Sequence, residues 1–170
     1  MKTLASLAIS MLAFAVGAWP VLADQASENH ASYVWVVGAT TPTDTAMAPD
    51  GSTITMKGHG TLMAGPGNTV TGGGTFHKSN GVSGTFAATD LVSFVSYGSG
   101  AAQGLPANLF GGEAKIRVTL SNGQTGVLTI VCELGSPPPS KMEGVQLILG
   151  SGVSDEYTMQ DGGTTVFIKL

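Results

Sequence analysis

The sequence predicts an all-β protein, a single-domain antiparallel β-barrel or barrel-like sandwich of about eight or nine strands. The tripeptide Gly-Thr-apolar occurs three times between residues 53 and 97, and short turn-like segments separate the copies. Side chains alternate faces along a strand, so each copy places its Gly and its apolar residue on one face and its Thr on the other. After residue 23 no stretch longer than a turn has the helical period.

The first 23 residues have the pattern of a cleavable secretory signal. Lys2 precedes an apolar run from residue 4 to 19, and the segment ends in Val21-Leu22-Ala23 just before Asp24. The run is about sixteen residues long, which is shorter than the ~18 to 20 that a membrane span requires. We therefore predict cleavage after Ala23, a mature single domain of residues 24–170, and a secreted protein, extracellular or periplasmic, without a membrane anchor.

The composition is acidic and poor in charged residues. Charged residues make up 11% of the chain, and loss of Lys2 with the signal brings the net charge from -4 to -5. No basic run or stripe is present to neutralise phosphates, so the sequence argues against nucleic acid and anionic membranes as partners. The single Cys132 excludes an internal disulfide, and its place on the inner face of a strand indicates a small apolar filler.

The first elements are a strand and a turn region. Residues 33–37 are rich in aromatic and β-branched side chains, which predicts a strand. Residues 40–52 carry two prolines and an Asp-Gly pair, so we expect turns there.

The glycine-rich meander that follows has one register in which apolar residues meet on one face. In this register, the loop of residues 64–68 pairs Leu62 with Val70. The turn of residues 79–81 then pairs two rings with glycines, Phe76 with Gly84 and Phe86 with Gly74, so that each ring can lie over a glycine. Because so many glycines weaken strands, we predict a sharply curved sheet, or a surface that another group approaches closely.

Residues 82–97 predict an unusually long strand, because they hold no Pro and only one Gly. Asp90 falls on the apolar face of this strand, and a bulge within residues 87–90 that bends the strand would reconcile the pattern. Residues 98–112 are the longest irregular stretch, and we expect a loop over one end of the fold.

The second half of the chain predicts a hairpin and three short strands. The hairpin joins residues 113–120 to residues 126–134, and the burial pattern favours Ile116 opposite Ile130 over the register of a two-residue Asn-Gly turn. The short strands are expected at residues 145–149, 156–160 and 164–170.

The chain offers few residues for metal or catalytic chemistry. His59 and His77 are ligand types for copper, but the register places them opposite Gly73 and Thr55, about 13 Å apart along the strands. We therefore expect solvated histidines, no metal and no cofactor. No local signature joins a nucleophile, a base and an acid, so no catalytic residue is assigned.

The candidate ligand site is the apolar inner face, with one acid as its polar group. It comprises Phe76, Phe86, Phe94, Asp90, Gly74 and Gly84. Small barrels of about eight strands are either filled by side chains or hold one small ligand, and both alternatives stay open. The simpler interpretation of Asp90 is a bulge residue that bonds neighbouring backbone amides.

Residues 48–54, 58–62 and 70–76 carry the patterns APDGxTI, GxGT and VTGGGTF. In these patterns the chain resembles a group of small secreted proteins of unknown function, from about Met47 to the strand of Cys132. The motifs are structural rather than catalytic, so the resemblance implies no activity. The meander is also loosely similar to the barrels of dirigent proteins and allene oxide cyclases.

The sequence favours a non-enzymatic function, the binding of a small apolar or amphiphilic molecule in the barrel, or an interaction role at the cell exterior. One alternative is a barrel enzyme of cyclase or isomerase type, in which a shaped apolar cavity guides the reaction and Asp90 assists. Another is a structural protein of the cell envelope or matrix. A cavity with a polar group inside would favour the first two, and a packed interior the third.

Overall fold

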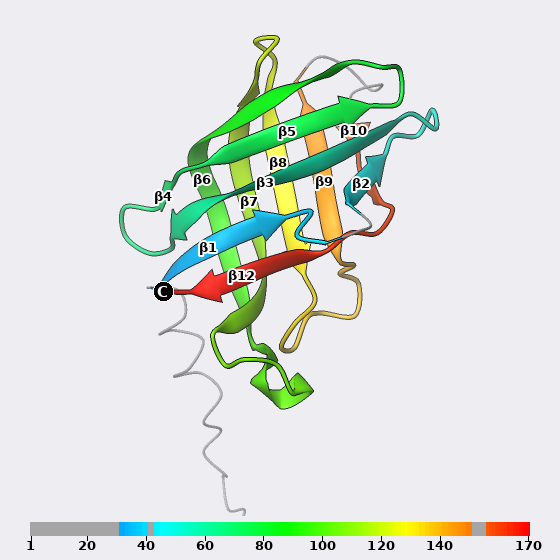
Figure 1. The fold of residues 1–170 in the computed structure, drawn as a ribbon. Helices are drawn as coiled ribbons and strands as arrows, with labels where there is room; N and C mark the ends of the chain where they lie inside the picture. Colours follow the sequence, from blue (N-terminus) through cyan, green and yellow to red (C-terminus); the bar gives the residue numbers. More distant parts are fainter. Residues whose placement is uncertain (1–30, 41–42, 151–155) are drawn as a thin grey trace, which may run out of the picture.

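The structure, a computed structural model, describes residues 31–40, 43–150 and 156–170, so the predicted signal and its cleavage site lie outside the described residues. These ranges form one antiparallel sheet of twelve strands with a short 3-10 helix and no α-helix, which confirms the all-β prediction (Figure 1). The elements are β1 Ser32–Val37, β2 Asp44–Met47, β3 Thr53–Met63, β4 Thr69–Val70, β5 Gly73–Lys78, β6 Ser83–Ser99, η1 Gly100–Gln103, β7 Leu109–Leu120, β8 Thr125–Cys132, β9 Gly144–Leu149, β10 Glu156–Tyr157, β11 Met159–Gln160 and β12 Thr165–Lys169.

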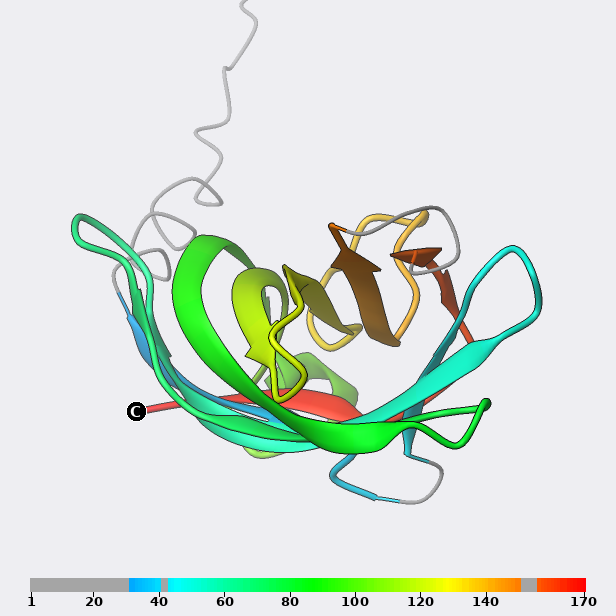
Figure 2. The ribbon, with the colours of Figure 1, turned by 90° about the horizontal axis from the view of Figure 1, so that it is seen from above.

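The strands lie in two layers that cross at a steep angle, as Figure 1 shows. Strands β12, β1, β3 and β5 are neighbours in one layer, and β7, β8 and β9 are neighbours in the other. Strand β6 belongs to both layers, because it pairs with β5 and with β7, and Figure 2 shows it curving from one layer to the other. Pairings thus lead from β7 through β12, β1, β3, β5 and β6 back to β7.

Strand β6 confirms the predicted long strand and its bend. Its pairing with β7 is irregular between Ala88 and Asp90, within the segment where the sequence predicts a bulge. The bulge changes the faces of the residues that follow, so that Leu91 is buried and Asp90 is exposed. Two further irregularities, between Leu91 and Ser93 and between Ser96 and Gly98, occur in the rest of the strand.

The glycines of β3, β5 and β6 allow these strands to approach one another closely. The predicted register is confirmed, with Gly58 opposite Gly74 and Leu62 opposite Val70. A Cβ atom on Gly74 would lie 2.0 Å from the carbonyl oxygen of Lys57, so no larger residue fits there without moving the backbone. The glycines therefore permit the strong curvature of this layer in Figure 2.

The two rings of the meander lie over glycines, and both predicted pairs are present, Phe76 with Gly84 and Phe86 with Gly74. The Phe76 ring is 3.0 Å from the Cβ position of Gly84, as the register predicts. The Phe86 ring also extends past its predicted partner Gly74 to the next strand, where its tip is 2.9 Å from the Cβ position of Gly58. Both rings are thus packed against the sheet itself.

The core between the layers is rich in aromatic side chains. The ring of Tyr33 lies 4.8 Å from that of Phe94 and 5.7 Å from that of Phe110, measured between centroids. Phe167 lies 5.1 Å from Phe94 in an edge-on arrangement, so the four rings form one cluster. Trp35, Ile54, Met56, Ile116, Leu128, Ile130, Cys132 and Leu147 are also buried in this core.

The hairpin of β7 and β8 has a different register from the predicted one. Ile116 pairs with Leu128, two residues from the expected partner Ile130. The loop holds three residues, since the Leu120 amide donates to the Gln124 carbonyl and Gly123 has φ 85°. A slip of two residues keeps every side chain on its face, so the burial pattern cannot distinguish the two registers.

Two further expectations about the strands are wrong. The segment 40–52 contains strand β2, all four residues of which pair with β3, where the sequence predicts turns. The expected single strand at 156–160 is two strands separated by Thr158, of which β10 pairs with β9 and β11 with β2. Strand β12 pairs with β1 and β7.

In the described ranges, no helix has the length and apolarity of a membrane span.

Candidate functional site

The structure separates the predicted ligand-site residues onto two faces. Phe76, Phe86 and Phe94 are buried on the inner face, where Gly74 and Gly84 lie on the strands beneath them. Asp90 is 60% exposed on the outer face, and its carboxylate lies 3.5 Å from the Arg117 guanidinium. The bulge after Ala88 turns Asp90 outward, so this acid does not join the rings.

The histidines occupy the positions that the register predicts. His59 pairs with Gly73 and His77 with Thr55, and both side chains are exposed. The Nδ1 atom of His77 lies 2.6 Å from the Ser83 hydroxyl on the neighbouring strand. Within the part of the chain that the structure describes, no three His, Cys, Asp or Glu side chains are grouped as metal ligands would be.

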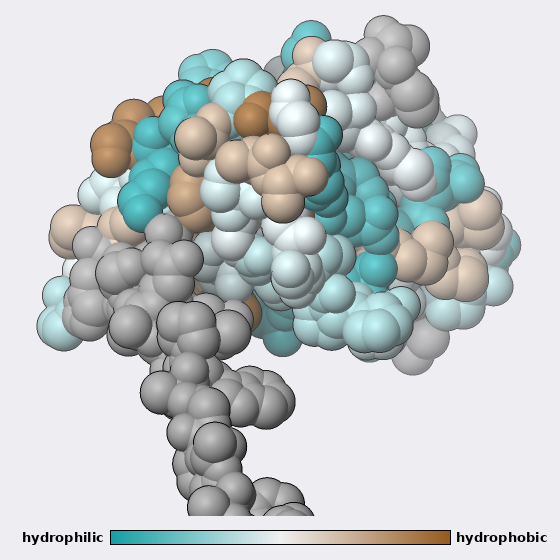
Figure 3. All heavy atoms as spheres, turned by 90° about the horizontal axis from the view of Figure 1, so that it is seen from below, coloured by the Kyte–Doolittle hydropathy of each residue, from teal (hydrophilic) through white to brown (hydrophobic). Residues whose placement is uncertain are grey.

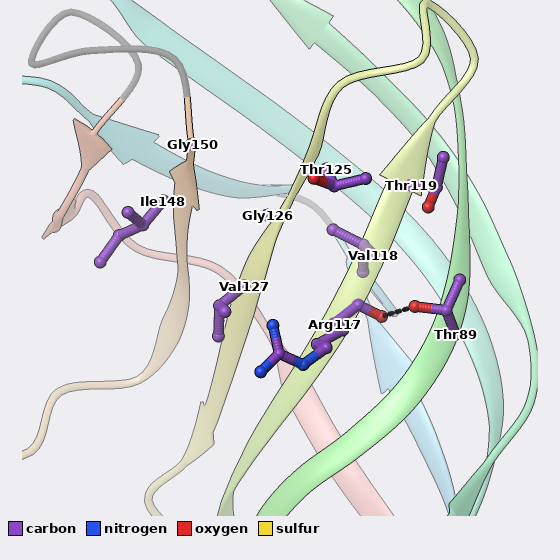
Figure 4. A pocket seen from close by; sticks show the side chains of 9 residues that line it. All are labelled: Thr89, Arg117, Val118, Thr119, Thr125, Gly126, Val127, Ile148 and Gly150. Carbon is purple, nitrogen blue, oxygen red and sulfur yellow. Dashed lines mark hydrogen bonds between the residues drawn. The ribbon is translucent and has the colours of Figure 1, made fainter.

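Two adjoining hollows lie on the outer face of β7, β8 and β9, and we call them together the outer groove. Their volumes are about 460 Å³ and about 360 Å³. Val127 and Ile148 line both, and Figure 4 shows Val127 between Arg117 and Ile148 in the first hollow. The lining of the first hollow also includes Thr89, whose hydroxyl donates to the Arg117 carbonyl at 3.2 Å.

The centre of the outer groove is one row of paired residues across five strands. The row runs Asp90, Arg117, Val127, Ile148 and Glu156. Its two apolar members are direct cross-strand neighbours, and Ile148 is 46% exposed. Charged residues therefore flank a small apolar strip on an otherwise polar face.

Most of the residues that line the second hollow have polar or charged side chains. Glu113 lies largely buried at one end, between the ammonium of Lys115 at 3.6 Å and that of Lys141. Burial raises the pKa of the neighbouring Tyr97 to about 12, and the charge and hydrogen bond of Glu113 add to this effect. The Nε2 group of Gln160, also in the lining, is buried and has no hydrogen-bond partner among the described residues.

The outer groove holds an unusual share of the cationic side chains. Three of the seven Lys and Arg residues of the chain line it, although the chain has a net charge of -4. They are Lys115, Arg117 and Lys141. Figure 3 shows a different side of the molecule, from below, where small hydrophobic areas are scattered among hydrophilic ones.

A second cluster of titratable groups contains the fully buried Asp44 and the half-buried Glu143. Asp44 has 0% exposure, and one of its carboxylate oxygens accepts the Gly38 amide while the other has no partner among the described residues. Burial raises the pKa of Asp44 to about 6, against the lowering effect of the Gly38 amide, and the charge of Glu143 raises it further. Glu143 itself accepts from the Thr165 amide at 2.7 Å and the Glu133 amide at 2.7 Å.

The environment of Cys132 confirms that this residue fills space in the apolar core. Its side chain is buried, and burial raises the pKa of the thiol to about 12, with a further contribution from the charge of Glu143. The thiol is therefore protonated at neutral pH and has little nucleophilic character.

Sequence reasoning missed the outer groove because its parts are distant in the chain. One signal was present: Val127 and Ile148 lie within the apolar runs 127–128 and 147–149, where strict alternation would require a polar residue. Two adjacent strand residues point to opposite faces of the sheet, so one apolar residue of each pair lies on the face away from the core. The pairing of these outward residues across β8 and β9 is what the sequence does not contain.

Comparisons of the chain with protein-family models, curated proteins and solved structures find no match.

Proposed function

We propose that this protein is a secreted, non-enzymatic binding protein that takes a small apolar or amphiphilic molecule in the outer groove. The observation that supports this most directly is the apolar pair formed by the half-buried Val127 and the exposed Ile148, where the two hollows meet. Apolar side chains within a recess are the usual floor of a small-molecule site, and nearby polar groups orient the ligand.

The packing of the inner face argues for this location over the interior. The Phe94 ring lies 3.0 Å from the Cβ position of Gly112 and packs against the other rings of the core. The rings of Phe76 and Phe86 are in similar contact with glycines. Side chains thus fill the region where the sequence places a ligand, so the interior does not support a ligand inside the barrel and by itself favours the structural alternative. The outer groove is the reason to propose binding, and a ligand there needs no rearrangement of this core.

We infer further that the circuit of pairings from β7 through β12, β1, β3, β5 and β6 is a barrel of six strands. The pairing of β6 with both β5 and β7 supports this interpretation. A barrel has no free edges along its circuit. Strands β8 and β9 would then extend from it and carry the outer groove on a firmly paired sheet.

Export is the other part of the proposal, with cleavage after Ala23. The signal pattern supports it, as does a low content of charged residues, 11% of the chain. Intact-mass analysis of protein recovered from the culture medium or periplasm should give a chain that begins at Asp24. Recovery of a species that keeps residues 1–23 would contradict export by a cleaved signal.

The binding proposal can be tested with a neutral fluorescent probe, N-phenyl-1-naphthylamine. We expect saturable binding, and Ile148→Ser should weaken it roughly fivefold, because a half-exposed aliphatic side chain contributes about 1 kcal/mol on burial. The matched control is Val92→Ser, since Val92 is 45% exposed on β6 and Ile148 is 46% exposed in the outer groove. No binding by the wild type, or equal losses in the two variants, would refute the proposal.

A further inference from the structure

We propose that the natural ligand carries an oxyanion, of the carboxylate type, and that the second hollow of the outer groove binds this end. The inference rests on the proposed function, because it assigns an orientation to a ligand in the same groove. Three observations carry it: the charges of the lining, an unpartnered buried donor, and the position of the apolar strip.

Among the described residues that line the second hollow, cationic side chains exceed anionic ones by one. Two ammonium groups, those of Lys115 and Lys141, face a single carboxylate, that of Glu113. Arg117 in the neighbouring hollow is matched by Asp90. In a chain with a net charge of -4, a recess with a positive balance attracts an anion and disfavours a cationic ligand.

The Nε2 group of Gln160 is a hydrogen-bond donor without an acceptor among the described residues. A buried amide N–H without a partner is costly, so such groups are rarely left unsatisfied in native proteins. Gln160 lines the same hollow as the two lysines, and its Nε2 group is buried without a partner among the described residues, so the side chain must turn toward the hollow before this group can donate to a ligand. An oxyanion at this place would accept from Gln160 and from an ammonium group together.

The apolar strip lies one row of the sheet away from the anion-binding end. Lys115 pairs with Thr129, and two residues along the strands Arg117 pairs with Val127, which is a displacement of about 7 Å. A ligand whose oxyanion lies beside Lys115 therefore has its chain directed over Val127 and Ile148. The geometry points to a single-chain amphiphile with an acidic end group, not to a free small anion.

The test compares dodecanoate, dodecan-1-ol and acetate by isothermal titration calorimetry, below the concentrations at which the amphiphiles aggregate. We expect dodecanoate to bind about tenfold more tightly than the alcohol, since a hydrogen bond to a charged group is worth about 1.5 to 3 kcal/mol before screening by solvent. Lys115→Gln should abolish this preference, whereas the control Lys57→Gln, on the outer face of β3, should keep it.

Gln160→Met distinguishes a ligand-binding role from a structural one. Because the change removes an unpartnered buried donor, we expect an unchanged or higher urea midpoint for the free protein, and weaker binding of dodecanoate but not of dodecan-1-ol. A lower midpoint with unchanged dodecanoate affinity would overturn the assignment of Gln160.

The outcomes separate the two proposals. If the alcohol and dodecanoate bind equally well and Ile148→Ser weakens both, the groove binds amphiphiles but the oxyanion assignment is wrong. If acetate binds as tightly as dodecanoate, the apolar strip has no role and the orientation is wrong. If neither amphiphile binds, the proposed function itself fails.

Discussion

Replacement of Asp44 by asparagine should change the pH dependence of stability. The carboxyl group of Asp44 is fully buried, and its pKa is raised to about 6 from the ordinary value of 3.8, mainly by burial. The folded protein therefore binds this proton more tightly than the unfolded chain does. The contribution of Asp44 to stability is then complete below about pH 4 and is lost as the pH rises through about 6.

The size of the effect follows from the same two values. A difference between 3.8 and about 6, at 1.36 kcal/mol per pH unit, corresponds to a loss of about 3 kcal/mol in the free energy of unfolding at neutral pH. An asparagine keeps an acceptor oxygen for the Gly38 amide and cannot ionise. Relative to the wild type, Asp44→Asn should therefore gain about 3 kcal/mol between about pH 4 and pH 7.

Urea unfolding curves at several pH values across this range measure the difference directly. Asp161→Asn serves as the control for the removal of one negative charge, because Asp161 is exposed. A difference between Asp44→Asn and the wild type that stays constant with pH would show that Asp44 has no raised pKa. A difference that moves in the opposite direction would mean that the folded protein stabilises the carboxylate, and the argument from burial would be wrong.

Two further predictions concern packing. Gly74→Ala should cost about 1 to 3 kcal/mol of stability, because its Cβ would lie 2.0 Å from the Lys57 carbonyl oxygen. The control Gly150→Ala should cost nothing, because the nearest described atom to its Cβ is at 3.9 Å. Equal urea midpoints for the two variants would contradict the prediction. Cys132 should resist iodoacetamide in the folded protein at about pH 8 and react in urea, because it is buried and its thiol has a pKa of about 12. Modification is measured by mass. Rapid modification of the folded protein would show an accessible thiolate.

The sequence was most informative where glycines and rings had to meet. Pairing Phe76 with Gly84 determined the register of β5 and β6, because a shift of the pairing by one residue would have turned the apolar residues to solvent. The same reasoning failed for the β7–β8 hairpin, since slips by two residues leave all faces unchanged. The sequence also gives no sign that Gly73, opposite His59, is closely packed, although a Cβ there would lie 2.2 Å from the Phe86 carbonyl oxygen.

The candidate site depended on contacts that no local pattern encodes. Val127 and Ile148 are far apart in the chain and become neighbours only through the pairing of β8 with β9. Gln160 reaches the same hollow from β11, a strand that the sequence merges with β10. Asp90 was placed with the rings by parity, and a bulge of one residue was enough to reverse its face.

The place of β12 between β1 and β7 sets an order for assembly. This strand follows all the others along the chain, so the edges of β1 and β7 that it covers stay open until it arrives. Tyr33 near the start of the domain pairs with Lys169 near its other end, and such long-range pairing makes folding slow. Open edges are templates for other chains in the meantime. A substitution in β12 is therefore expected to lower the yield of folded protein through aggregation before it alters any property of the molecules that have folded.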